Sequence, residues 1–257
     1  YREDIKDMKE MGLKSFRFSI AWTRIFPNGP TEVCQAGIDY YNDMINALIE
    51  ADIVPLFDLF HSDLPFWVIE MGGILCPEFV DWFGTYAEVC FKEFGDRIPY
   101  WSTINEPSIN VMASYAYGTN APFLKDMDLA IKACHNALLA HYRAVKIYKD
   151  MGLPGKIGAV IHVQPTYSLS FDPKDIHAMD HDFAFYAGWW LDAMIKGHYP
   201  EVLADNTYYM GKLPEGYEKD LEKYFVPVDF IGVNFYPLLH IVGAGGRMPV
   251  IALIMNP

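Results

Sequence analysis

Short apolar, strand-like runs alternate with longer segments of helical period along this chain, and no other feature restricts its fold as much. Strands are expected at residues 15–22, 53–60, 98–105, 156–163 and 229–236. The main helices are expected at residues 1–12, 40–52, 77–96, 127–152 and 178–197. Because parallel neighbours need a helical crossover between them, the alternation predicts an α/β fold with a parallel sheet.

The loops and the length decide between α/β architectures. No G-x-G-x-x-G loop follows any expected strand, which argues against a dinucleotide-binding fold. The chain has 257 residues, close to the size of about 250 that is typical of a (β/α)8 TIM barrel. Such a barrel has eight strands, so an incomplete barrel with about five of them is predicted. Without a linker, a repeat or a shift in composition, residues 1–257 are expected to form a single partial barrel domain.

Composition excludes several classes of partner. Apolar residues make up 52% of the chain and aromatic residues 16%, so a buried core is expected rather than a disordered segment. A formal net charge of −13 repels phosphate backbones and anionic lipids, which disfavours nucleic acid as a partner. No run of eighteen apolar residues is present, so a membrane partner is not expected either.

The cysteines and the first residues add two expectations. Cys34, Cys76, Cys90 and Cys134 form no Cys-x-x-Cys pair, so they are predicted to be core thiols rather than zinc or redox ligands. The chain starts inside an amphipathic helix and not with Met, so we expect further sequence upstream. The terminus therefore predicts no particular cellular compartment.

Polar side chains lie within or just after nearly every expected strand, and a (β/α)8 barrel gathers its catalytic groups at the carboxyl ends of its strands. These residues are Arg17, His61, Asn105, Glu106, His162, Gln164, Asn234 and Tyr236. Polar groups beside many aromatic rings are typical of a pocket that hydrogen-bonds a hydroxyl-rich ligand and stacks on its faces. The pattern predicts a sugar site, with no metal and no cofactor.

The triplet Asn105-Glu106-Pro107 ends the third expected strand with an unusual combination. Pro107 cannot continue a strand ladder, so Glu106 is expected at the barrel mouth, partly withdrawn from water. A carboxylic acid that stays protonated there can give its proton to a departing glycosidic oxygen, and Asn105 can bind a sugar hydroxyl.

Motifs spread over nearly the whole chain resemble family 1 glycoside hydrolases, the β-glucosidase family. They read, in order, "FRFSIAWTRIFPNG" (16–29), "FHSDLPFWV" (60–68), "MGGILCPEFVDWF" (71–83), "FGDRIPYWSTINEP" (94–107), "HNALLAHYRAVKIY" (135–148), "GWWLDAMIKGHYPEV" (188–202) and "DFIGVNFYPL" (229–238). The resemblance implies a (β/α)8 barrel that hydrolyses small β-glycosides or oligosaccharides with retention of configuration. It also implies truncation at both ends, without the first, seventh and eighth strands.

The resemblance implies a role for each predicted site residue. Glu106 matches the family's general acid/base, Asn105 its binder of the sugar 2-hydroxyl and His61 a sugar-binding histidine. For His61, a buried histidine bonded to the backbone is the alternative.

Three other residues match positions that support the family's nucleophile. Arg17 matches an arginine beside the nucleophile, and Asn234 with Tyr236 match the pair that holds it in place. A structural ion pair is the alternative for Arg17. His177 and His181 have a spacing that could suit a metal, but a solvated helix start is favoured.

The sequence also departs from the family's motifs. Family members usually read His-Trp-Asp-Leu-Pro where residues 61–65 read His-Ser-Asp-Leu-Pro. A His-Ala-Pro-Gly loop becomes Asn-Ala-Pro-Phe at 120–123, and a Gly-Gly-Trp becomes Gly-Gly-Ile at 72–74. The Thr-Glu-Asn-Gly motif that carries the nucleophile is absent.

Retaining chemistry needs two carboxyl groups about 5–5.5 Å apart, so the missing motif leaves several hypotheses open. Asp58, Asp63 and Asp229 are poor substitutes for the nucleophile, because the first and last lie inside or before strands and Asp63 is expected to cap a helix or turn. Four function hypotheses remain: a β-glucosidase-type hydrolase, an inactive fragment, a non-catalytic sugar binder and another glycanase that uses Asn-Glu-Pro.

An open five-strand sheet also predicts self-association through its edges, one of which the apolar residues 248–257 could cover.

Overall fold

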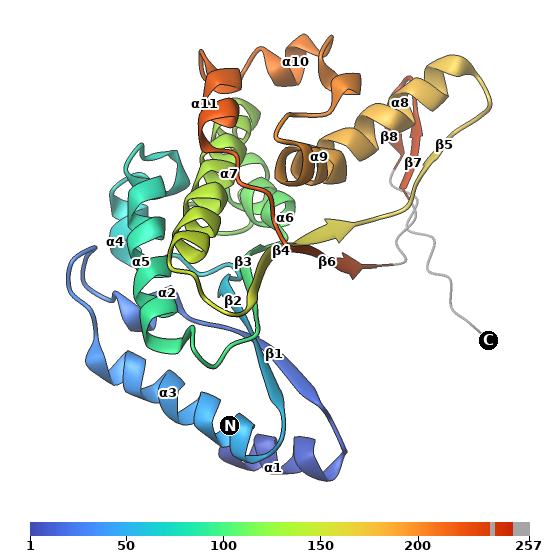
Figure 1. Ribbon diagram of the computed structural model, residues 1–257. Helices are drawn as coiled ribbons and strands as arrows, with labels where there is room; N and C mark the ends of the chain where they lie inside the picture. The colour runs from blue at the N-terminus through green and yellow to red at the C-terminus, as the bar shows by residue number, and fades with distance from the viewer. Residues whose placement is uncertain (237–239, 249–257) are drawn as a thin grey trace.

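The computed structural model describes residues 1–236 and 240–248. Its main sheet has five parallel strands in the order β1-β2-β3-β4-β6. These strands are β1 (Ser15–Ser19), β2 (Val54–Phe60), β3 (Tyr100–Asn105), β4 (Lys156–Val163) and β6 (Phe230–Phe235). Since neighbouring strands follow one another around the sheet, it is the wall of a half-barrel (Figure 1). The prediction of an incomplete (β/α)8 barrel is confirmed.

Helices connect these strands and cover one face of the sheet. The α-helices are α1 (Arg2–Glu10), α2 (Trp22–Ile25), α3 (Gln35–Glu50), α4 (Phe66–Glu70), α5 (Phe79–Phe94), α6 (Pro107–Val111), α7 (Met127–Asp150), α8 (Pro173–Phe183), α9 (Trp189–Lys196), α10 (Thr207–Met210) and α11 (Tyr217–Tyr224). Shorter 3-10 and π-helical turns span Gly73–Leu75, Met112–Ala116, Ala184–Gly188 and Glu201–Leu203. Helix α7 begins where the Asp126 carboxylate accepts hydrogen bonds from two backbone N–H groups, a standard N-cap.

The main core lies between the helices and the sheet. Trp22, Phe57, Tyr86 and Trp101 are all almost fully buried there, and the indole of Trp22 stacks on the ring of Tyr86 at 5.0 Å. The Tyr86 hydroxyl donates to the backbone carbonyl oxygens of Ile20, just after β1, and Leu59, near the end of β2. The buried hydroxyl of this α5 residue is therefore hydrogen-bonded to the sheet.

The opposite, concave face of the sheet is open. It forms a groove of about 500 Å³ whose lining includes Leu56, Tyr100 and Phe230. Val54 and Tyr100 are each more than 40% exposed there. In a full (β/α)8 barrel, layers of side chains fill this space, so the half-barrel leaves its inner layer facing water.

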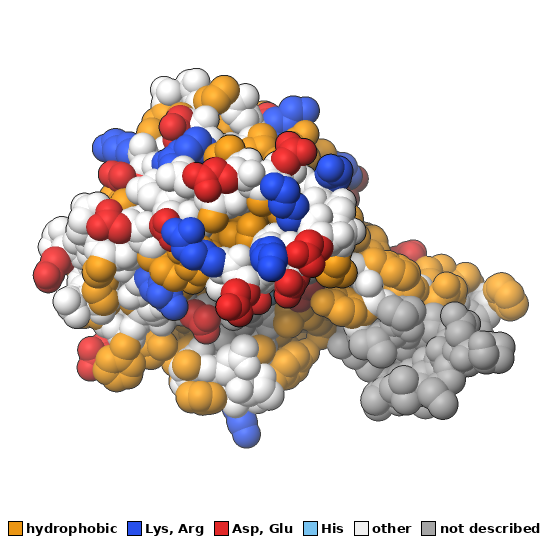
Figure 2. Space-filling view, turned by 90° about the horizontal axis from the view of Figure 1, so that it is seen from below, with side chains coloured by type: hydrophobic (Ala, Val, Ile, Leu, Met, Phe, Trp, Pro, Cys, Tyr) orange, Lys and Arg blue, Asp and Glu red, His pale blue; other side chains and the backbone are white. Residues whose placement is uncertain are grey.

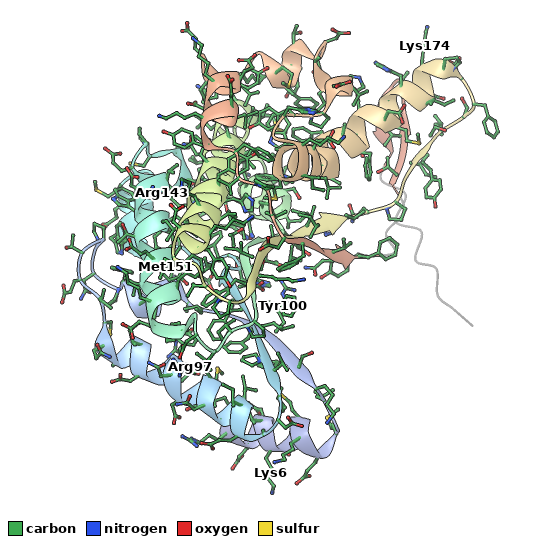
Figure 3. All side chains as sticks on the ribbon, in the orientation of Figure 1. Lys6, Arg97, Tyr100, Arg143, Met151 and Lys174 are labelled. Atoms are coloured by element: carbon green, nitrogen blue, oxygen red, sulfur yellow. The ribbon has the colours of Figure 1, made fainter. Side chains whose placement is uncertain are left out.

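At the amino-terminal ends of the strands, the loop after α5 is joined to α3 by polar contacts. Arg97 donates hydrogen bonds to Asn42 and Asn46 of α3, at 2.6 and 3.0 Å. Figure 3 shows Arg97 beside this end of the sheet and Tyr100 at the start of β3.

Figure 2, which views the molecule from below, shows basic and acidic side chains interspersed on the surface. No described helix is long and apolar enough to cross a membrane.

Three expectations need correction. The first strand stops at Ser19 rather than at residue 22, because Trp22 starts α2 and buries its indole among the α5 aromatics. The last expected helix, 178–197, is α8 and α9 joined by a π-helical turn. Cys90 and Cys134 are buried, but Cys34 and Cys76 are only partly buried, so two of the four cysteines are not core thiols.

A second sheet was not predicted. It joins β5 (Thr166–Ser168), β7 (His240–Gly243) and β8 (Gly246–Met248) in that order. β7 runs parallel to β5 and antiparallel to β8. These strands are three or four residues long, too short to show a period-2 pattern, and the pairing of β5 with β7 joins segments more than seventy residues apart.

Candidate active site

A polar network crosses the carboxyl-terminal rim of the half-barrel. The Arg17 guanidinium of β1 makes two contacts with the Asp58 carboxylate of β2, at 2.7 and 3.1 Å. Arg17 Nη2 also donates to Asn105 Oδ1 of β3 at 2.6 Å. The register of the parallel strands places Arg17 opposite Leu56 and Asp58 opposite Ser102, so the long arginine side chain spans several positions along the sheet to reach both partners. Asp58 is almost fully buried, so the ion pair satisfies a charge that could not otherwise stay there.

The network continues to the last strand through Asn234 of β6. Its Nδ2 group donates to Asn105 Oδ1 at 3.1 Å and to Glu106 Oε1 at 2.7 Å. Asn105 Oδ1 therefore accepts from both Arg17 and Asn234, which orients its Nδ2 group the other way, 3.3 Å from His61 Nε2. Residues separated by up to 129 positions thus form one connected array.

Glu106 lies at the centre of this rim in a strained backbone conformation. Its φ of 45° and ψ of 57° are left-handed, a region that non-glycine residues rarely occupy. Its N–H donates to Val160 O at 2.7 Å, and Pro107 starts α6 directly after it. The strand thus turns sharply at Glu106, and the carboxyl side chain is only 14% exposed. Such strain clusters at functional sites, where surrounding contacts maintain it.

His162 of β4 lies against the same carboxyl group. Its Nδ1 is 3.5 Å from Glu106 Oε1, and its ring stacks on the ring of Tyr236 with centroids 5.4 Å apart. Both ring nitrogens are buried without a hydrogen-bond partner among the described residues. An unpaired imidazole inside a polar rim is costly unless a ligand or water completes it.

His61 is the exposed member of the group. More than half of its side chain is accessible, so the alternative of a buried histidine is wrong. Its carbonyl oxygen accepts a hydrogen bond from Asn110 Nδ2 at 2.6 Å, and the same amide reaches Asn105 O at 2.7 Å. Its Nδ1 is 3.7 Å from the Asp58 carboxylate. Hydrogen bonds from Asn110 therefore hold the backbone at His61 and Asn105, whereas the His61 imidazole is exposed.

A buried histidine supports the rim from behind. Burial lowers the pKa of His141 to about 3, so the ring is neutral at physiological pH. Its Nδ1 lies 2.6 Å from Thr103 Oγ1, on the helix-covered side of β3. This contact anchors α7 to the strand that ends in Glu106.

The structure brings together all six predicted site residues, which are Arg17, His61, Asn105, Glu106, Asn234 and Tyr236. It adds Asp58, Asn110 and, as a contact of Glu106, His162. The position of His162 near a strand end was a usable signal, whereas a carboxylate inside a strand, like Asp58, carries none. Of the other two acids that were expected to be poor substitutes for the nucleophile, Asp229 accepts a hydrogen bond from Ile157 N at the amino-terminal end of the sheet, and Asp63 caps no helix.

The described residues contain no group of three or more His, Cys, Asp or Glu arranged to hold a metal. The rings of His177 and His181 lie 4.1 Å apart, and Asn206 contacts His181 Nδ1 at 3.2 Å.

Comparisons with known proteins place this geometry in context. The model of glycosyl hydrolase family 1 matches residues 1–243. A beta-glucosidase A from Acetivibrio thermocellus is 39% identical over 236 residues, which cover 92% of this chain and 53% of that protein. The beta-glucosidase A of Thermotoga maritima is 38% identical over 238 residues, with the same coverage. The chain therefore spans about half the length of the curated relatives it matches.

Solved structures agree with the sequence relatives. The family 1 β-glucosidase from Thermotoga maritima superposes with a TM-score of 0.90 at 37% identity, over 94% of this chain and 54% of that one. The same values apply to the Thermotoga enzyme in complex with deoxynojirimycin. The half-barrel thus has the fold of just over half of such a protein.

Proposed function

The chain belongs to glycosyl hydrolase family 1, and from this we propose that its polar rim binds a β-glycoside with Glu106 as the general acid/base. The observation that carries the proposal is the Glu106 carboxyl group, strained, mostly buried and hydrogen-bonded to Asn234 at the carboxyl ends of the strands. A proton donor must be held within hydrogen-bond reach of the leaving oxygen, and this environment provides the rigidity.

Asn105 and His61 are proposed to bind sugar hydroxyls. Both acceptor positions of Asn105 Oδ1 are engaged by Arg17 and Asn234, so its Nδ2 group is presented as a donor toward the open side. His61 lies 3.3 Å from this group and is exposed, so one hydroxyl could contact both.

Arg17, Asn234 and Tyr236 are proposed to position these groups. Arg17 is largely neutralised by Asp58, as the structural alternative for this arginine predicted, and it also holds Asn105. Asn234 links Asn105 to Glu106, and Tyr236 packs its ring against His162. In this proposal they keep the acid and the hydroxyl donor in a fixed relative geometry.

Hydrolysis with retention needs a second carboxylate as nucleophile. Asp58 is the buried acid of the rim, but two bonds to Arg17 and its burial withhold it from that role. In the hydrolase a carboxylate outside the described rim therefore has to act as the nucleophile, and without it the rim would bind the glycoside without turnover. This observation favours the non-catalytic sugar binder as the second candidate function.

Calorimetry with deoxynojirimycin tests the proposal, because a relative of this chain is known in complex with it. We expect saturable binding that Glu106→Gln weakens at least about tenfold, since loss of a charged hydrogen bond costs roughly 1.5–3 kcal/mol. The matched control is Glu88→Gln, an exposed glutamate of α5 paired with Lys92.

Turnover of an aryl β-glucoside separates the two candidate functions. Binding without turnover supports the sugar binder, and turnover abolished by Glu106→Gln supports the hydrolase. Absence of binding in the unmodified chain, or binding unaffected by Glu106→Gln, would contradict the proposed site.

A further inference from the structure

His162 is a histidine of the rim that has no role of its own in the proposed function. It lies on β4, and only 7% of the residue is exposed. Neither ring nitrogen has a hydrogen-bond partner within the described residues. A buried polar group without a partner is costly to keep, so this position calls for an explanation in what the site does.

The strand register places His162 next to Asn234. The two residues are paired positions of the neighbouring strands β4 and β6. Val160, two residues before His162, lines the concave groove together with Asn234, so the His162 side chain lies on the same face. Asn234 Nδ2 donates to Glu106 Oε1 at 2.7 Å, and His162 Nδ1 is 3.5 Å from the same oxygen. Two nitrogen atoms from adjacent strands therefore approach one carboxyl oxygen.

The second carboxyl oxygen of Glu106 is left for a ligand. Oε2 makes no hydrogen bond or ion pair within residues 1–236 and 240–248. It is also not one of the buried side-chain atoms that lack a partner, so solvent reaches it. Oε1 already accepts a hydrogen bond from the Asn234 amide nitrogen, which can only donate. When Glu106 is protonated, its proton therefore belongs on Oε2.

The same geometry decides which nitrogen of His162 carries a proton. A bare Nδ1 would direct its lone pair at Glu106 Oε1, and two acceptors repel each other strongly in a buried place. A protonated Nδ1 donates toward this oxygen instead, whether the ring is neutral or charged. The 3.5 Å separation is longer than the usual N–H···O distance of about 2.7–3.2 Å, and such contacts tighten in many sites when the ligand binds.

We propose that His162 is a positioning residue for Glu106: its Nδ1–H group donates to Oε1 and thereby keeps the proton of the acid on Oε2, where it reaches the glycosidic oxygen of a bound ligand. The inference rests on the proposed function of the rim and adds a residue to it. Tyr236 fixes the orientation of the imidazole, because the two rings stack with centroids 5.4 Å apart and planes at 27°. The bond from Glu106 N to Val160 O holds the backbone of the acid to the strand that carries His162.

Nitrogen-15 NMR of the histidine side chains tests the tautomer without any ligand. A protonated ring nitrogen and a bare one resonate far apart, and the His162 signals are those that disappear in His162→Asn. We expect a proton on Nδ1 in the unmodified chain and in Glu106→Gln, whose amide oxygen replaces Oε1 as the acceptor. Glu106→Leu has no acceptor, so the ring should revert to the Nε2–H tautomer that a free histidine prefers. A bare Nδ1 in the unmodified chain, or an Nδ1–H tautomer that persists in Glu106→Leu, would overturn the proposal.

Titrations with methyl β-glucoside test the effect on binding. His162→Phe keeps a ring against Tyr236 but has no donor, so the affinity should fall about threefold to tenfold, the effect of one hydrogen bond. His162→Asn places an amide near the position of Nδ1 and should recover most of that loss. The matched control is His198→Phe, an exposed histidine after α9, which should bind as the unmodified chain does.

The outcomes separate this inference from the proposed function. Equal affinity of the unmodified chain and His162→Phe, or no recovery in His162→Asn when circular dichroism shows that it is folded, would reduce His162 to a packing role and overturn the proposal. If the unmodified chain does not bind methyl β-glucoside at all, the proposed function of the rim fails. The NMR comparison of the Glu106 variants then still decides whether His162 donates to Glu106.

Discussion

Trp101 and Tyr100 are neighbours in β3, yet they belong to two different environments. Trp101 points toward the helices, has no exposed surface and packs edge-on against Phe57 and Phe91 at about 5 Å. Tyr100 points into the concave groove and is 44% exposed. The helix-covered face is a finished hydrophobic core, whereas the concave face is an unfilled barrel interior that carries the polar rim.

This difference separates stability from function. The covered face buries large aromatic side chains, so changes there act on the free energy of unfolding. The open face buries few apolar groups but holds the Glu106 array, so under the proposed function changes there should act mainly on ligand binding. The polar array can therefore keep its geometry as long as the helix-covered core is intact.

The largest expected effect comes from the covered face. Trp101→Ala should lower the free energy of unfolding by about 3–5 kcal/mol, because it removes a fully buried indole and leaves a cavity. Urea denaturation followed by circular dichroism measures this loss. A loss below about 1 kcal/mol would show that the core is not packed as the structure indicates.

A pH effect from the same face is expected to be next in size. The folded-state pKa of His141 is lowered to about 3 by burial, below the value of about 6.5 in the unfolded chain. Its contribution to stability is therefore fully present above pH 6.5 and declines as pH falls toward 3, by about 1.4 kcal/mol per pH unit. At pH 5 the loss reaches about 2 kcal/mol.

Comparing unfolding at pH 7 and pH 5 checks this prediction. His141→Gln should show a smaller decrease over that interval than the unmodified chain, whereas His198→Gln, at an exposed position, should not. Identical pH dependence in the unmodified chain and in His141→Gln would contradict the buried neutral histidine.

At the boundary between the two faces, Asp58→Asn should have an intermediate effect. It breaks a pair whose acid is buried but whose Arg17 side chain is one-third exposed, so about 1–2 kcal/mol of stability should be lost rather than the full cost of a buried pair. Because Arg17 also holds Asn105, deoxynojirimycin affinity should fall as well. Calorimetry that shows lower stability but unchanged affinity would separate the ion pair from the site.

The smallest stability effect is expected on the open face. Tyr100→Ala should cost less than about 1 kcal/mol, since the ring is nearly half exposed and mainly contacts Phe230.

Self-association through the open edges of the sheet would bury part of its concave face, and we propose that β1 and β6 mediate it. The sedimentation coefficient should then depend on protein concentration, and Val233→Lys on β6 should reduce the association. A monomer at all concentrations with a sharp unfolding transition would contradict it.

The sequence alone was sufficient for the features that depend on local pattern. The alternation of apolar runs and helical periods determined the α/β class, and strand 156–163 was predicted with its observed bounds. Motifs spread over nearly the whole chain identified the family, and Pro107 marked where the strand stops. The helix and strand signals can be read over a few neighbouring residues, because apolar residues on the buried face of an element recur with the period of that element.

Only the tertiary structure decided the contacts that make a site. The pairing of Arg17 with Asp58, the bond from Asn234 to Glu106 and the stacking of His162 on Tyr236 join residues between 41 and 128 positions apart. Such contacts depend on strand register and on helix packing rather than on neighbouring residues, so no local pattern in the sequence encodes them.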